Sequence, residues 1–277
     1  MLNAENLGGV LLNSQHNFAW FTGGKNNGVD LSNPNGIGSL LIRNDGKRFL
    51  LANKVEMPRL LTEEVSEKDF EPIEFEWQAD KINGGFVPET AQNLLEKPLA
   101  TDLFYNPNFR VVEGFIAKCR YQLTVEEIER FRKLGKDAGK ILDRIYSRID
   151  AGQTEKEIAN IVKLVLGNSG INSVVTLVAA DERIKNYRHP IPTENVWRKV
   201  LMIVVCAKRD GLIASLSRIF SVGNVDKDLR IRTNAVAKVH AQMMHATRPN
   251  ATGKEIFEIT KKSYSEVGFD GEELNHH

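Results

Sequence analysis

One histidine in this chain lies in a loop whose composition suits proton transfer. Residues 186–192 read Asn-Tyr-Arg-His-Pro-Ile-Pro, with His189 at the centre. Because imidazole titrates near neutrality, His189 is a candidate acid, base or hydrogen-bond donor. The alternative is a loop histidine that is hydrogen-bonded to backbone, and the residues themselves leave both interpretations open.

The remaining histidines offer less chemistry. His240 and His245 are five residues apart on a predicted helix, which places them off a common face. His16 follows a turn. His276 and His277 resemble a metal-binding pair, but they stand at a chain end, where residues normally fray. We interpret all five as structural or surface residues on these grounds.

The composition is that of an ordinary globular protein. The 277 residues exceed the size of one typical core, so we expect two domains. The 37 Lys and Arg residues nearly balance the 36 Asp and Glu residues, so the chain has no large net positive charge that would attract nucleic acid or an anionic membrane. The apolar run 200–207 is too short to span a bilayer. Two cysteines, Cys119 and Cys206, exclude a disulfide scaffold. Since the N-terminus shows no signal peptide, we expect a cytoplasmic protein.

The first hundred or so residues predict a small mixed α/β unit. Apolar runs over 37–42 and 48–52 flank Asn44-Asp45-Gly46, which predicts a hairpin. Residues 54–64 and 88–97 have helical composition. The Gly-rich stretch 23–28 lacks a strand, loop and helix phosphate motif, so we interpret it as a surface turn.

After residue 124 the pattern becomes more specific. The predicted elements are a helix over 124–149, a helix over 154–170, a strand over 174–180, and strands over 200–207 and 212–223. Thr124 and Glu127 form a capping box, and Asp210-Gly211 predicts a tight turn between the last two strands. The first of these strands is apolar throughout, so we expect both its faces to be covered.

Part of this pattern repeats. Thr-Glu-Lys-Glu-Ile over 154–158 returns as Thr-Gly-Lys-Glu-Ile over 252–256, an offset of 98 residues, and Ile161 and Gly170 have counterparts at the same offset. This favours two copies of one helix-helix-strand unit; chance similarity of amphipathic helices is the alternative. The second copy stops at His277, so we expect its strands to be missing and the chain to be truncated.

The order of these motifs resembles the creatinase, prolidase and aminopeptidase P superfamily. The His-Pro-Ile-Pro loop and the Ser-Arg-Ile-Phe-Ser-Val-Gly strand of 217–223 carry the resemblance most specifically. It implies an α/β (α+β) pita-bread fold, with the duplicated unit around a curved sheet. It also implies a creatinase-type N-terminal α/β domain over 1–115 and an incomplete pita-bread domain over 116–277.

The resemblance raises the question of metals. Complete peptidase members hold two divalent metals (Mn, Co or Zn) with an Asp on each hairpin strand, a His and two later Glu. Val204 and Ser215 stand at the Asp positions, and His277 stands at the His position. Valine supplies no lone pair and serine only a neutral hydroxyl, so we expect no cofactor in this chain. Cys206 is a softer donor, interpreted as core packing.

The resemblance therefore implies an Xaa-Pro aminopeptidase- or dipeptidase-like protein with metal-dependent hydrolysis lost or impaired. His189 is the candidate proton relay, and Tyr187 and Arg188 are candidates for substrate contact. One alternative is a creatinase-like, metal-free C–N amidohydrolase that uses His189 on amide or guanidino substrates. Another is a non-enzymatic module that binds peptides or proteins. The expected partners are a peptide or a small amide or guanidino substrate, and a second copy in a homodimer.

Overall fold

The computed structural model describes residues 2–275, which form two compact units. One unit comprises Met1–Ile141, Leu166–Val174 and Cys206–Ser215, and the other comprises Leu142–Val165, Val175–Val205 and Leu216–His277. The expected domain boundary at residues 115 and 116 stays a prediction.

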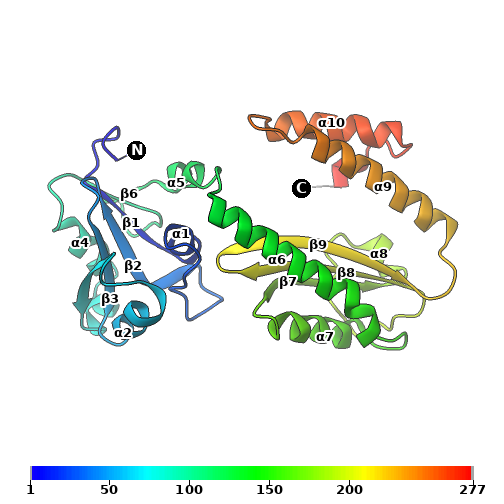
Figure 1. The fold of residues 1–277 in the computed structure, drawn as a ribbon, viewed down its shortest axis with the longest axis horizontal. Coiled ribbons are helices and arrows are strands. Elements are labelled where there is room, and N and C mark those ends of the chain that lie inside the picture. The colour runs from blue at the N-terminus through cyan, green and yellow to red at the C-terminus, as the bar shows by residue number, and fades with distance from the viewer. Residues whose placement is uncertain (1, 276–277) are drawn as a thin grey trace. The chain divides into compact units, whose positions relative to one another are not determined.

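A six-stranded mixed sheet lies in the first unit (Figure 1). Its strands are β1 (Gly9–Ser14), β2 (Asn35–Arg43), β3 (Arg48–Asn53), β4 (Glu71–Phe75), β5 (Leu99–Thr101) and β6 (Arg110–Val111), in the spatial order β4-β3-β2-β1-β5-β6. β2 pairs antiparallel with β1 and β3, and the other pairs are parallel. Ile42 pairs with Arg48 and Gly46 has a φ of +89°, so the predicted hairpin is confirmed.

Apolar side chains are buried on both faces of this sheet. Leu12, Leu40 and Leu50 join one core cluster, whereas Leu11 and Leu41 join the other. The accompanying helices are α1 (Gln15–Phe21), α2 (Met57–Arg59), the π-helical turn η1 (Leu60–Glu64), α3 (Gln78–Ile82), α4 (Phe86–Gln92) and α5 (Glu113–Cys119). The sheet therefore has a covered core on each side.

One of the two helices predicted in this region extends further in the prediction than in the structure. Residues 88–97 were expected to be helical, but α4 ends at Gln92. The Gln92 side chain donates to the carbonyl of Lys97 and accepts from the Leu99 amide, at 3.2 and 2.8 Å. Because proline disfavours helical geometry in the residue before it, Pro98 also opposes continuation of the helix.

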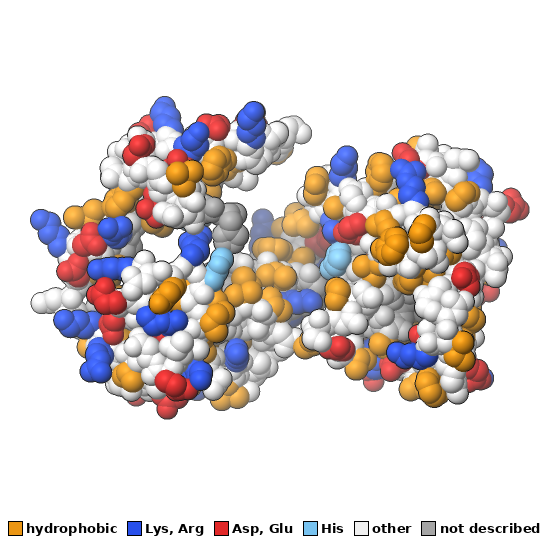
Figure 2. Space-filling model, turned by 180° about the vertical axis from the view of Figure 1, so that it is seen from behind, with side chains coloured by type: hydrophobic (Ala, Val, Ile, Leu, Met, Phe, Trp, Pro, Cys, Tyr) orange, Lys and Arg blue, Asp and Glu red, His pale blue; other side chains and the backbone are white. Residues whose placement is uncertain are grey.

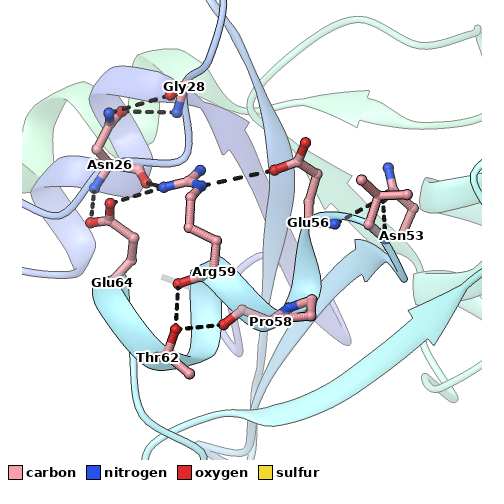
Figure 3. A network of polar contacts seen from close by, with 9 residues as sticks. Asn26, Gly28, Asn53, Glu56, Pro58, Arg59, Thr62 and Glu64 are labelled. Atoms are coloured by element: carbon pink, nitrogen blue, oxygen red, sulfur yellow. Dashed lines mark hydrogen bonds and ion pairs between the residues drawn. The ribbon is translucent and has the colours of Figure 1, made fainter.

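The Gly-rich stretch 23–28 is held by side chains of the α2–η1 segment (Figure 3). The Asn26 amide donates to a Glu64 carboxylate oxygen at 2.8 Å, and Arg59 donates to the other oxygen at 3.0 Å. The Asn26 side chain accepts from the Gly28 amide at 2.8 Å. A protein carboxylate thus already binds the loop amide of Asn26, consistent with a structural turn.

The predicted capping box at residue 124 is present. The Glu127 carboxylate accepts from the Thr124 amide at 2.8 Å, and the Glu127 amide donates to the Thr124 hydroxyl at 3.2 Å. Helix α6 (Val125–Arg144) follows and ends in the 3₁₀ turn η2 (Ile145–Arg148). The buried positions recur at helical spacing: Leu134, Ala138, Leu142 and Ile145.

Between Ile149 and Asn275 the structure contains a three-stranded sheet and four further helices. The elements are α7 (Glu155–Gly167), β7 (Asn172–Ala180), α8 (Arg183–Asn186), β8 (Val200–Arg209), β9 (Leu212–Ser221), α9 (Lys227–Ala246), α10 (Gly253–Glu266) and the 3₁₀ turn η3 (Glu272–Asn275). The strand order is β7-β8-β9. Asp210 and Gly211 both have positive φ, 52° and 77°, which matches the tight turn predicted between β8 and β9.

The two faces of β8 differ in how deeply they are buried. Leu201, Ile203 and Val205 are fully buried, whereas the alternating residues Val204 and Cys206 are only partly buried. Successive side chains of a strand point to opposite faces, so β8 has one fully buried face and one partly buried face. An apolar run by itself did not reveal that half of its side chains lack full cover.

Surface charge and helix hydrophobicity bear on the expected partners. On the face shown in Figure 2, acidic and basic side chains are interspersed. None of the helices between residues 2 and 275 is both long and apolar enough to cross a bilayer. The absence of a nucleic-acid partner stays a prediction.

Ion pairs connect α6 to the hairpin strands within each unit. Asp137 contacts Arg209 at 2.9 Å, and Asp143 contacts Arg218 at 2.8 Å. Arg209 together with Lys133 holds the pKa of the Asp137 carboxyl below its ordinary value. The contacts that lower this pKa stabilise the fold at pH values above the ordinary Asp pKa of about 4. Their contribution is lost as the pH falls through the folded-state pKa.

We therefore expect Asp137→Asn to lower the free energy of unfolding by about 0.5–1 kcal/mol at pH 7. The difference from the wild type should shrink toward zero as the pH falls through the folded-state pKa of Asp137, because the carboxyl is then protonated in both states. Urea unfolding at several pH values measures this. Glu129→Gln, at an exposed position of the same helix, is the control. An Asp137→Asn penalty that does not change with pH would contradict the account.

Candidate functional site

The predicted ligand positions lie on the two strands of the β8–β9 hairpin. Val204 and Cys206 on β8 are partly buried there, and Ser215 on β9 is exposed. The Ser215 hydroxyl donates to the Cys206 sulfur at 3.3 Å. The structure therefore brings Ser215 and Cys206 together on one face.

These side chains do not fit two divalent cations. Two such ions side by side need several anionic oxygen ligands, with bridging carboxylates to offset their repulsion. Val204 has no donor atom, and the Ser215 hydroxyl is neutral. Between residues 2 and 275 the structure shows no group of three or more His, Cys, Asp and Glu arranged to hold a metal. His277, the remaining predicted ligand, lies outside the described residues.

The other candidates lie on the loop between β7 and β8. His189 is exposed, whereas the neighbouring Pro190 is buried. The Arg183 guanidinium lies 5.3 Å from the centroid of the Tyr187 ring. Arg188 lies close enough to Tyr264 of α10 to affect its titration. Burial raises the pKa of Tyr264, Glu272 acts in the same direction, and Arg188 opposes the rise.

A buried carboxylate at the start of α7 binds both ends of this loop. Glu155 is 0% exposed. Its first carboxylate oxygen accepts from the Ala180 amide at 2.8 Å, and its second accepts from the amide and hydroxyl of Thr193, at 2.9 and 2.8 Å. Arg183 forms an ion pair with the same carboxylate. The charge is thus buried with a partner and several donors, as burial of a carboxylate requires.

A second carboxylate closes the base of the loop. Asp181 accepts from the amides of Arg198, Lys199 and Val200 at 3.0, 2.9 and 2.9 Å. Its own backbone has a φ of +54°, a conformation that Asp adopts more readily than most residues. The entry to β8 is therefore tied to the end of β7.

Sequence reasoning missed both of these acids. Glu155 was treated only as part of a helix start, and Asp181 was not singled out. The internal repeat contained one signal for Glu155. The cap residues are the same in both copies, but the second copy has Gly253 where the first has Glu155, so capping does not require an acid at this position. The roles assigned to His189, Tyr187 and Arg188 stay predictions.

Comparison with known proteins agrees with this architecture. The chain superposes on the prolidase from Pyrococcus horikoshii with a TM-score of 0.77 at 18% identity, covering 96% of this chain and 76% of that one. It superposes on the Xaa-Pro dipeptidase from Bacillus anthracis with a TM-score of 0.74 at 18% identity, covering 94% and 73%. An uncharacterized peptidase from Staphylococcus aureus is 24% identical over 251 residues, which are 86% of this chain and 70% of that protein. The fold class is therefore that of the pita-bread peptidases, as predicted.

Residues 129–277 match Peptidase_M24, described as metallopeptidase family M24. The chain belongs to this family.

The Asp181 contacts generate a stability prediction. Asp181→Ala removes three charge-assisted hydrogen bonds and places a less suitable residue at a positive φ, so the free energy of unfolding should fall by about 2–4 kcal/mol. Glu182→Ala, at the exposed neighbouring position, should change it by less than about 0.5 kcal/mol. Urea unfolding of both variants measures the difference, and equal effects would refute a specific role for Asp181.

Proposed function

We propose that this chain is an Xaa-Pro dipeptidase-like protein in which metal-dependent peptide hydrolysis is lost or impaired. Membership of family M24 and the likeness to prolidase structures support the peptidase-like part. The observation that carries the second part is the pair Val204 and Ser215, one on each strand of the hairpin where metallopeptidase members have Asp.

The chemistry of these two positions supports the loss. A metallopeptidase of this kind uses its ions to activate water as the nucleophile. Exchanging two carboxylates for an alkyl group and a hydroxyl removes two formal negative charges from the metal-binding positions. The repulsion between two dications is then not offset there, and affinity for the metal pair should fall. Cys206 does not replace the lost carboxylates, because a single sulfur donor supplies none of the bridging carboxylate oxygens that a metal pair requires.

The proposal includes the organisation of the chain. We place a creatinase-type N-terminal α/β domain at 1–115 and a pita-bread domain at 116–277, and we expect a cytoplasmic homodimer. Exposed apolar residues on the hairpin, such as Ile213 and Ile219, support an association surface. His189 remains the candidate proton relay for any residual chemistry, with Tyr187 and Arg188 as candidate substrate contacts.

Metal analysis combined with an activity assay tests the proposal. Purified protein is incubated with Mn²⁺, dialysed and analysed by mass spectrometry for metal, then assayed on Xaa-Pro dipeptides and peptides with and without chelator. We expect less than one tightly bound ion per chain and no chelator-sensitive turnover. The prolidase from Pyrococcus furiosus, a solved structure of the same fold, serves as the positive control. Two tightly held ions together with turnover that a chelator abolishes would overturn the proposal.

A further inference from the structure

The loop that carries His189 is organised around one buried side chain. We propose that Glu155 is a positioning residue for this loop: its carboxylate binds the segments before and after His189 and so fixes where the imidazole is presented. The inference rests on the proposed function only in taking the His189 loop as the site segment, and it holds whether or not hydrolysis is retained.

The contacts lie on both sides of His189 in the chain. Before it, Glu155 binds the Ala180 amide and pairs with Arg183. After it, the same carboxylate binds Thr193 through both its amide and its hydroxyl, and the Asn195 side-chain amide approaches at 3.4 Å. One carboxylate therefore closes the loop across its base.

Arg183 extends this influence toward the tip of the loop. Its guanidinium donates to the Ile191 carbonyl at 3.1 Å and lies over the Tyr187 ring. Tyr187 and Ile191 are each two residues from His189. Because the guanidinium is planar and its donors are fixed in direction, the ion pair with Glu155 also sets the orientation of these two contacts. Glu155 is thus connected, through Arg183, to residues on both sides of His189.

The internal repeat separates this role from helix capping. Both copies have the same capping box: Thr154 with Glu157, and Thr252 with Glu255, each with amide-to-carboxylate distances of 2.7 Å and amide-to-hydroxyl distances of 3.2 Å. The residue inside the box differs, because the second copy has Gly253 in place of Glu155. A helix of this kind therefore starts without an acid at that position, and capping does not explain Glu155.

The site also selects a carboxylate over a carboxamide. Each oxygen of Glu155 accepts from a backbone amide, one from Ala180 and the other from Thr193. A glutamine would present its NH₂ group to one of these donors, and it would leave Arg183 without its counter-charge. Glu155→Gln is therefore a change of nearly constant shape that removes the positioning function.

The test compares Glu155→Gln with Glu157→Gln in the full chain, without peptide or metal. Glu157 is an exposed cap residue on the same helical turn, so it is the matched control. Hydrogen exchange over residues 181–196 should be about tenfold faster or more in Glu155→Gln and unchanged in Glu157→Gln. The ring resonance of His189, assigned by its disappearance in His189→Ala, should shift in Glu155→Gln only.

Arg183→Lys provides a second variant if Glu155→Gln does not fold. Lysine keeps the positive charge beside Glu155 but lacks the planar guanidinium whose donors reach both Glu155 and Ile191. Amide hydrogen exchange over the loop should therefore again be faster, and the His189 resonance should shift. A folded Glu155→Gln or Arg183→Lys with wild-type exchange over 181–196 and an unmoved His189 resonance would overturn the proposal. Because neither readout involves metal or turnover, failure of the proposed function would leave this test unaffected.

Discussion

The alternation of side chains along β8 is the constraint on which the candidate site depends. Leu201, Ile203 and Val205 are all fully buried, so this face of the strand must be the covered one. Val204 then has to point to the opposite, partly buried face, because the strand period is two residues. A slip of one residue would expose the three core side chains and bury Val204, which the apolar energy of the covered face opposes. The register of β8 therefore fixes which of its side chains lie on the partly buried face.

Carboxylates in this part of the molecule serve backbone structure. Glu155 and Asp181 both accept hydrogen bonds from main-chain amides, and Glu155 also has Arg183 as a counter-charge. A buried carboxylate with its oxygens engaged in this way has little capacity left for a cation. Two carboxylates thus lie at the base of the His189 loop, whereas Val204 and Ser215 bring none to the hairpin.

Local sequence signals predicted the elements well. The capping box at Thr124 and the Asp210-Gly211 turn rest on hydrogen bonds or dihedral preferences among a few neighbouring residues, so both could be predicted. The length of α4 depended on a Gln92 side-chain contact with residues further along, and this escaped prediction. The Glu155 clamp joins residues up to 40 apart in sequence, and pattern reasoning has no means to pair them. Sequence thus predicted local geometry, but not the long-range polar bonds that fix the loop.

The repeat shows why similar helices differ in burial. Ala138 on α6 is fully buried, whereas its counterpart at the same offset, Val236 on α9, is 54% exposed. Valine is the more apolar of the two, so hydrophobicity alone would predict the reverse order. Helix formation depends on caps and local propensity, but burial depends on what packs against the helix. An internal repeat is therefore sound evidence for common secondary structure and a poor guide to which side chains lie in a core.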